Sequence, residues 1–469
     1  MRLQCLLEEL QAGHFHPGWC FSGSGELGNP TLLFSFPFAY YIGTLFTPLR
    51  WLGASMDIQY AAACYPAIAI SGMACWYWLR EIVSPRMALF GALVYLFIPY
   101  RFDLLYFRSA YYELWSMAFL PFVALYSRRW LHGQKDALPK LAVVFALLLF
   151  CHPKIGVLGG MLAGMYLLSS PRKIPALIVT FMVSVALVAP VVAPPLIYKD
   201  FMAIDDHLYG VKEDGSSMAL DGPGAWPNKY IRVENFGPGK QERVLLGCFL
   251  TIGTAFVLLA ILYARRRRLP EAMRRETFVW GGIFLLSFFM LFPISEPLWS
   301  MVRMFIAPFP WRMQHTIALA AVFLLIMTLC YALPPNKKTA TGNTVAVMIL
   351  VVLLALFASS GRDPETEDVY RRVVSAKSID SKYELPVWSH PFYDPELGHI
   401  KDLTEYFVNH YEARETSPKV LSPAHQDEIK VTRWGPEGIT LETQFSKEAK
   451  VTLDHHYFPV WRAETSLGE

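Results

Sequence analysis

Charged side chains are scarce in this chain. Only 17% of its 469 residues are Asp, Glu, Lys or Arg, whereas 54% are hydrophobic, and the mean hydropathy is +0.31. A water-soluble globule of this size needs more charge on its surface, so the composition excludes that class. The net charge of +3 is also too small to indicate a nucleic-acid-binding protein.

Signatures of nucleotide and metal chemistry are missing as well. The seven cysteines show no metal-ligand spacing. The glycines at 221–224 and 237–239 lack the flanking strand and helix of a phosphate-binding loop. The sequence therefore predicts no nucleotide and no metal, and it names no cofactor. Asp205-Asp206-His207 is a possible acid/base or metal group, but adjacent aspartates are more typical of a solvated loop.

Long apolar stretches, by contrast, are abundant. The stretch 244–263 ends at four consecutive arginines, Arg265 to Arg268, which mark its cytoplasmic end by the positive-inside rule. When the sides alternate from there, the other basic clusters also fall in the cytoplasm. The pattern predicts an all-α polytopic membrane bundle of about ten transmembrane helices. The predicted spans are 59–79, 87–99, 114–127, 141–151, 155–168, 174–197, 244–263, 278–293, 315–333 and 345–359.

One apolar segment, 31–49, fits this pattern badly. Prolines lie in it and next to it, and counting it as a span would invert every later loop against the positive-inside rule. We predict a broken, membrane-surface or re-entrant segment on the outer face. The N-terminus is then also outside, where residues 2–11 form a short amphipathic helix. Cys5 and Cys20 either form a disulfide there or remain free.

Three regions follow from this topology. Residues 1–58 form an extracytoplasmic or juxtamembrane N-terminal region. Residues 59–360 form the transmembrane domain, with an outer loop at 198–243, and residues 361–469 form an extracytoplasmic α+β tail. Alternating polar and apolar residues near 428–432, 439–443 and 450–453 predict strands of a small β-rich domain in that tail.

The outer segment 99–113 carries the densest group of ionisable residues, namely Arg101, Asp103, Arg108 and Glu113. These four would not share one face of a helix, so we expect a turn or break. Ionisable groups at membrane depth usually pair with each other or line a wet cavity. They are either structural ion pairs anchored by interfacial aromatics or a site for an anionic substrate, with arginines on phosphate oxygens.

Two other outer segments carry candidate groups. The hairpin at 151–154 is so short that His152 must lie near the membrane surface, where it could serve as acid or base and Lys154 could hold a phosphate. A lone histidine in a tight turn is more often structural. Trp311 and Arg312 open a span on the same side, and Arg312 either snorkels or clamps a lipid phosphate. We predict that Arg312 converges with the charged residues of 99–113 on one outward-facing cavity.

Several motifs in these segments resemble bacterial polytopic membrane glycosyltransferases of the GT-C type. The nearest branch carries the label "6-pyruvoyl-tetrahydropterin synthase-related membrane protein", although nothing in the chain looks like a pterin enzyme. The resemblance covers most of the chain. It rests on glycine and proline motifs at 13–30, on the charged segment 99–113, on His152, on Phe309-Pro310-Trp311-Arg312, and on aromatic motifs at 383–388 and 457–461.

The resemblance implies transfer of a sugar from a polyprenyl-phosphate-linked donor to an envelope acceptor, on the outer face of the bacterial cytoplasmic (inner) membrane. The partners it implies are this donor and membrane lipids, with no nucleic acid and no nucleotide. Substrate-binding roles would fall to Arg101, Arg108, Lys154, Trp311 and Arg312, and catalytic roles to Asp103, Glu113 or His152.

The same family places a catalytic acid in its first outer loop, after a first span. By that comparison we expect an N-terminal truncation that removes the acid, which puts the activity of this chain in question. Two alternatives remain open. A transporter or flippase for a lipid-linked or anionic substrate would also use intramembrane arginines, although no internal repeat is visible. A non-catalytic envelope-assembly protein would need no charged outer cluster.

Overall fold

The computed structural model describes residues 2–20, 31–34, 36–108, 110–168, 170–197, 240–295, 297–299, 310–332, 420–421, 429–435, 438–443 and 451–453. These residues are mostly helical, with two small antiparallel sheets. The chain divides into two compact units. One comprises Phe36–Val192 and Val211–Arg362, and the other comprises Met1–Ser35, Ala193–Gly210 and Asp363–Glu469.

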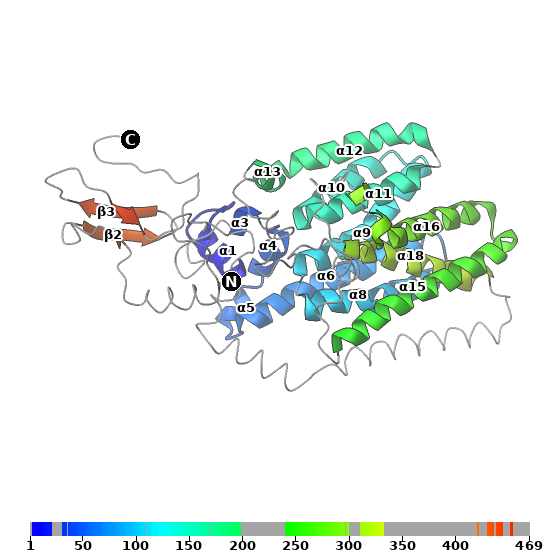
Figure 1. Cartoon of the computed structure of the whole chain (residues 1–469), viewed down its shortest axis with the longest axis horizontal. Helices are drawn as coiled ribbons and strands as arrows, with labels where there is room; N and C mark the ends of the chain where they lie inside the picture. The colour runs from blue at the N-terminus through cyan, green and yellow to red at the C-terminus, as the bar shows by residue number, and fades with distance from the viewer. Residues whose placement is uncertain are drawn as a thin grey trace. The chain divides into compact units, whose positions relative to one another are not determined.

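The first of these units is a bundle of helices (Figure 1). Polar caps and prolines set several of its helix starts. Ser55 accepts a hydrogen bond from the backbone N–H of Ile58 and so caps α6, while Pro85 and Pro153 occupy the first positions of α7 and α11. The helices are α4 (Phe38–Thr44), α5 (Pro48–Trp51), α6 (Met56–Leu79), α7 (Pro85–Leu96), α8 (Pro99–Phe102), α9 (Tyr111–Leu131), α10 (Ala137–Cys151), α11 (Pro153–Leu167), α12 (Ile174–Leu187), α15 (Lys240–Ala264), α16 (Glu271–Phe289) and α18 (Gln314–Met327).

Three helical stretches of the described chain are long and apolar enough to cross a membrane: Met56–Leu79, Leu246–Ala264 and Pro310–Ala332. Three bent helix pairs raise the number of candidate spans to six if each pair counts as one. These helices agree with a multi-pass membrane protein. The prediction of about ten spans goes further than this, and the predicted span 345–359 lies outside the described residues.

The predicted span 174–197 is not one continuous helix. It is divided into α12 and α13 (Ala189–Ile197), and the pair is bent by 81° at the break. Pro190, Pro194 and Pro195 explain the bend, because proline lacks the backbone N–H and its ring crowds the preceding turn.

Large aromatic side chains join the helices in the core of the bundle. Helix α6 packs against α7 and α9, and α18 packs against α15 and α16. Trp78 of α6, Trp280 of α16 and Phe323 of α18 are fully buried. Their ring centroids lie 4.8 Å (Trp78 to Trp280), 5.4 Å (Trp280 to Phe323) and 6.0 Å (Trp78 to Phe323) apart. Such ring pairs add to the stabilisation from burial.

The segment 31–49 is broken, as its prolines predict. It forms three short helices, α3 (Thr31–Phe34), α4 and α5, and Pro48 occupies the first position of α5. The longest of them, α4, has 7 residues. That length corresponds to roughly 10 Å, against about 30 Å for a hydrocarbon core. None of the three can therefore cross a membrane as a straight helix.

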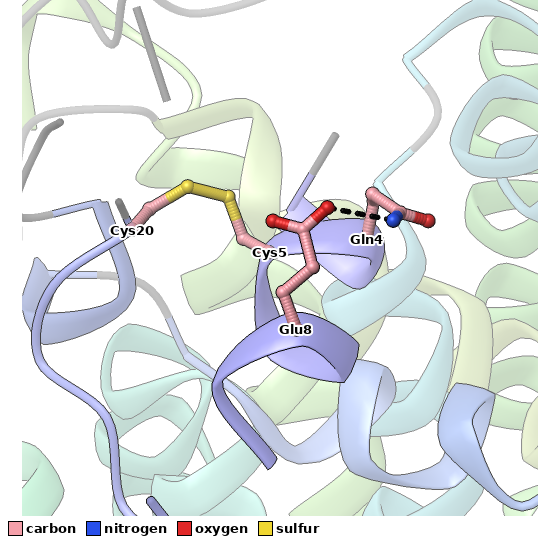
Figure 2. Close-up of a disulfide and its surroundings, with 4 residues drawn as sticks. All are labelled: Gln4, Cys5, Glu8 and Cys20. Carbon is pink, nitrogen blue, oxygen red and sulfur yellow. Dashed lines mark hydrogen bonds between the residues drawn. A yellow bond between two sulfur atoms is a disulfide. The ribbon is translucent and has the colours of Figure 1, made fainter. Parts of the chain in front are cut away.

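In the second unit, a disulfide ties helix α1 (Arg2–Gln11) to the segment after it. Cys5 and Cys20 are bonded, which answers the question that the sequence left open, and Figure 2 shows the bridge leaving α1 toward Cys20. On the same helix Gln4 donates a hydrogen bond to Glu8 over 2.7 Å. Leu3, Leu6 and Leu7 on one side of α1 are buried, as its amphipathic pattern predicts, but the acidic Glu9 is buried too.

The tail contains strands at the three places where its alternating pattern predicts them, and one further short strand, Val420–Leu421, that the pattern did not predict. Strands β2 (Ile429–Gly435) and β3 (Gly438–Thr443) pair antiparallel, with Trp434 opposite Ile439. Strands β1 (Val420–Leu421) and β4 (Thr452–Leu453) form a second antiparallel pair. Within the described residues of the tail, each of these two sheets has two strands.

Candidate functional site

The turn between α8 and α9 brings opposite charges together. A π-helix, Asp103–Phe107, follows α8 and ends with the backbone N–H of Arg108 donating to the carbonyl of Asp103 over 2.9 Å. Helix α9 then starts at Tyr111. This is the break that the charge pattern of 99–113 predicts, and π-helical turns of this kind are frequent at functional sites. It lets the Arg108 side chain reach Glu113 in the first turn of α9.

Glu113 is fully buried and is the centre of the cluster. Arg108 forms a bidentate pair with Glu113, donating from Nη2 to Oε1 over 2.6 Å and from Nη1 to Oε2 over 2.8 Å. Arg312 donates from Nε to Oε1 over 3.0 Å, and the Tyr100 hydroxyl donates to Oε2 over 3.3 Å. An ionised carboxylate has about four lone-pair sites. These four hydrogen bonds therefore use the acceptor capacity of Glu113.

The start of α18 supplies a histidine beside Arg312. Arg312 lies in the short helix Pro310–Met313, and His315 follows in the first turn of α18. The Nδ1 atom of His315 lies 2.9 Å from the carbonyl oxygen of Arg312. Because a carbonyl only accepts, Nδ1 carries the hydrogen. The other nitrogen, Nε2, is buried 3.9 Å from Glu113 Oε2 and has no hydrogen-bond partner in the described part of the chain.

The turn between α10 and α11 contributes His152 and Lys154. His152 is buried, with Nε2 3.9 Å from Glu113 Oε1, and its ring packs on Phe36 and Tyr112 at centroid distances of 5.0 and 5.3 Å. Burial, and next the charge of Arg312, holds the pKa of His152 well below its usual range. Burial also lowers the pKa of Lys154 to about 7, with Arg312 acting in the same direction and Glu113 against it.

Asp103 and Trp311 lie at the edge of this cluster. Asp103 Oδ2 is 4.0 Å from Arg108 Nε, and the Arg108 guanidinium lies 5.8 Å from the centroid of the Trp311 ring. The predicted convergence therefore holds for contacts among Arg108, Glu113 and Arg312, with Asp103 at the margin. The outward-facing cavity expected around these residues stays a prediction.

Arg101 departs from the predicted convergence. Its buried guanidinium donates to Ser71 Oγ over 2.6 Å and reaches the carbonyl oxygen of Tyr95, near the end of α7, at 3.5 Å. It makes no hydrogen bond to Glu113 or Asp103. The physical reason is local. The single turn of α8 places Arg101 at the carboxyl end of α7, where the helix dipole attracts a cation.

The site is rich in cationic side chains and also contains imidazole groups. Arg108, Arg312 and a protonated Lys154 outnumber the carboxylates of Glu113 and Asp103. Such a surplus favours an anion. Among the residues that the structure describes, no group of three or more His, Cys, Asp or Glu side chains could hold a metal ion.

Two residues of the cluster were missed by sequence reasoning. His315 stands three positions after Arg312, the spacing that puts both side chains on one side of a helix. Tyr100 precedes Arg101 within the segment already singled out for its charges. Asp205, Asp206 and His207 lie outside the described residues.

No protein family model, curated protein or solved structure matches the chain.

Proposed function

We propose that the chain is an integral-membrane glycosyltransferase that moves a sugar from a polyprenyl-phosphate donor to an envelope acceptor on the outer face of the bacterial cytoplasmic membrane. The observation that carries this proposal is the meeting of Arg108 and Arg312 on the buried carboxylate of Glu113, with Lys154 beside them. The motifs that resemble GT-C glycosyltransferases include both arginines and support it.

The chemistry of the leaving group matches this charge. When the bond between the sugar and a lipid phosphate breaks, negative charge develops on the phosphate, and preorganised cations and donors stabilise it. A guanidinium carries five N–H donors, so an arginine that holds a carboxylate can still donate to a phosphate oxygen. Arg108 and Arg312 are both held by Glu113, so their positions are set before a donor binds.

Topology supports an outer site. Glu113 lies in the first turn of α9 and the basic residues Arg128 and Arg129 lie in its last turn. Basic residues at span ends favour the cytoplasm, so the cluster around Glu113 belongs to the other side. The exposed arginines at 265, 267 and 268 mark the cytoplasmic end of α15 by the same rule. A bundle of about ten spans, as the apolar pattern predicts, completes this proposal.

Binding of farnesyl phosphate, a short polyprenyl phosphate, tests the proposed function. Protein in lipid nanodiscs would be titrated by calorimetry, with Arg108→Lys and Arg312→Lys as variants that keep the charge and lose the guanidinium N–H donors. Each should weaken binding about 10- to 100-fold, the equivalent of one charge-assisted hydrogen bond. Arg86→Lys, at the exposed start of α7, is the matched control and should bind normally. Equal affinity in all four proteins contradicts the proposal.

One observation favours a second function, a transporter or flippase for a lipid-linked anion. The stretch that leads into the site, Pro85–Leu96 with Pro99–Tyr106, is a helix pair bent by 43°. Transporters often build their binding sites from broken helices of this kind. Assays in proteoliposomes distinguish the flippase from the transferase. A flippase moves a fluorescent polyprenyl phosphate between leaflets without chemical change, whereas a transferase releases polyprenyl phosphate from its sugar.

A further inference from the structure

The hydrogen bonds around Glu113 indicate that this residue positions the two arginines and that another residue serves as the general base. Glu113 already accepts from Arg108, Arg312 and Tyr100, so it has no lone pair left for an incoming hydroxyl group. We propose that His315 takes the proton from the acceptor hydroxyl, while Glu113 fixes the two arginines. This inference rests on the proposed transferase function and names the proton acceptor for it.

The orientation of His315 is that of a histidine base. Its Nδ1–H donates to the carbonyl oxygen of Arg312 over 2.9 Å, which fixes the tautomer and leaves the Nε2 lone pair open. The Tyr100 ring packs edge-on against the imidazole at 4.9 Å and holds its plane. A base oriented by a hydrogen bond on its far nitrogen is the arrangement that nucleophile activation requires.

The Nε2 atom of His315 is buried beside the carboxylate of Glu113. It is 3.9 Å from Glu113 Oε2, too far for a direct hydrogen bond, and it has no hydrogen-bond partner in the described part of the chain. A buried acceptor without a donor is unfavourable. A hydroxyl group that donates to Nε2 would satisfy this nitrogen and would stand beside the arginines that hold the phosphate.

Other titratable groups around the centre are less suited to this role. Asp103 faces Arg108 from the π-helix, and Lys154 on α11 is a cation when protonated. Tyr100 on α8 already donates to Glu113. His152 lies against Oε1 on the opposite side of the carboxylate, and no hydrogen bond to a backbone carbonyl fixes which of its nitrogens carries the hydrogen.

The proposed transfer accounts for each bond, proton and electron pair. The acceptor oxygen forms a bond to the anomeric carbon of the sugar, and its proton moves to His315 Nε2. The bond from that carbon to the phosphate oxygen breaks, and its electron pair leaves on the polyprenyl phosphate, beside Arg108 and Arg312. Before the next turnover the imidazolium gives its proton to solvent or to the departing phosphate.

The His315→Asn variant tests this assignment, because an asparagine amide can keep the hydrogen bond to the Arg312 carbonyl and cannot accept the proton. Farnesyl-phosphate-linked glucose, galactose and mannose would be the donors. We expect kcat to fall about 100-fold or more, with KM and farnesyl phosphate affinity unchanged. The decline of rate at acidic pH should also disappear. His132→Asn is the matched control, since exposed His132 makes the same type of bond, from Nδ1 to the carbonyl of Arg128, at 2.9 Å.

Nuclear magnetic resonance of ¹⁵N-histidine-labelled protein adds a readout that needs no turnover. At pH 7 the His315 signals, assigned through His315→Asn, should show a hydrogen on Nδ1 and none on Nε2. A hydrogen on Nε2, or an unchanged kcat in His315→Asn, overturns the inference and leaves the proposed function standing. Wild-type protein that binds farnesyl phosphate and transfers no sugar favours the flippase and overturns both. Absence of binding also overturns both.

Discussion

Arg128 and Glu276 form an ion pair that joins the last turn of α9 to the first turns of α16, with Nε and Oε1 2.9 Å apart. Both side chains are largely buried, at 12% and 7% exposure. The other Glu276 oxygen accepts from the Tyr166 hydroxyl over 3.1 Å, and Arg128 reaches Glu81 at 3.4 Å. One polar network therefore ties α9, α11 and α16 together.

Breaking this pair should destabilise the bundle. Glu276→Ala leaves the guanidinium of Arg128 buried without its main partner, and we expect a loss of about 1–3 kcal/mol in unfolding free energy. Lys140→Ala removes the exposed pair with Asp136 and should change stability by less than about 0.5 kcal/mol. Thermal unfolding in the same detergent measures the change in stability of each variant. Equal shifts would show that the buried network contributes no more than a surface pair.

Glu113→Gln should destabilise the site and increase its response to anions. A neutral amide cannot balance Arg108 and Arg312, so two buried guanidinium groups repel each other. We expect a lower melting temperature, and a larger rise with added farnesyl phosphate than in the wild-type protein, because the ligand restores the missing negative charge. Melting curves with and without the ligand measure this. A smaller rise in the variant would contradict the role of Glu113 as counter-ion.

Phosphate binding should weaken as pH rises above neutrality. Burial lowers the pKa of Lys154 from 10.5 to about 7, so its positive charge is lost as pH passes upward through that value. A phosphate monoester is almost fully ionised by then, since its second pKa is about 6. Affinity for farnesyl phosphate should therefore fall between pH 7 and 9 in the wild-type protein. In Lys154→Arg, which stays charged, the affinity should remain constant, and a parallel decline there would rule out Lys154 as the cause.

Reporter fusions should place the two ends of the bundle in different compartments. A reporter inserted at Pro270, next to Arg265 to Arg268, should be active in the cytoplasm, because basic residues at a span end favour that side. A fusion at position 400, in the tail, should be active outside. Two reporters in the same compartment would show that the span count is wrong. The Cys5–Cys20 disulfide is an independent marker, since such bonds form in oxidising compartments.

Much of the helical framework was predictable because its signals are local. Apolar runs correspond to α6, α9 and α15, and the prolines of 31–49 correctly predicted a broken segment. The break between α12 and α13 was missed, although Pro190 and its neighbours carried the signal. Hydropathy measures the length of an apolar run, whereas a bend depends on which backbone N–H groups are absent.

The site was only partly predictable because its contacts are distant in sequence. Arg108 and Glu113 are five positions apart, so their proximity follows from one local break in the helix. Arg312 and Glu113 are 199 positions apart, and no periodicity specifies which helix ends meet. The predicted place of Arg101 in the site was wrong for the opposite reason. Nearness in sequence suggested a shared site, but the local backbone turns its side chain toward α7.

Helix α9 carries charges at both ends, with Glu113 in its first turn and Arg128 in its last. Along the axis these residues are roughly 22 Å apart at 1.5 Å per residue, less than the roughly 30 Å of a typical hydrocarbon core. Both charges are held by partners on other helices, and nearly all of α9 between them is buried. A shift of α9 along its axis would therefore break both ion pairs at once, so the pairs fix the position of the helix within the bundle.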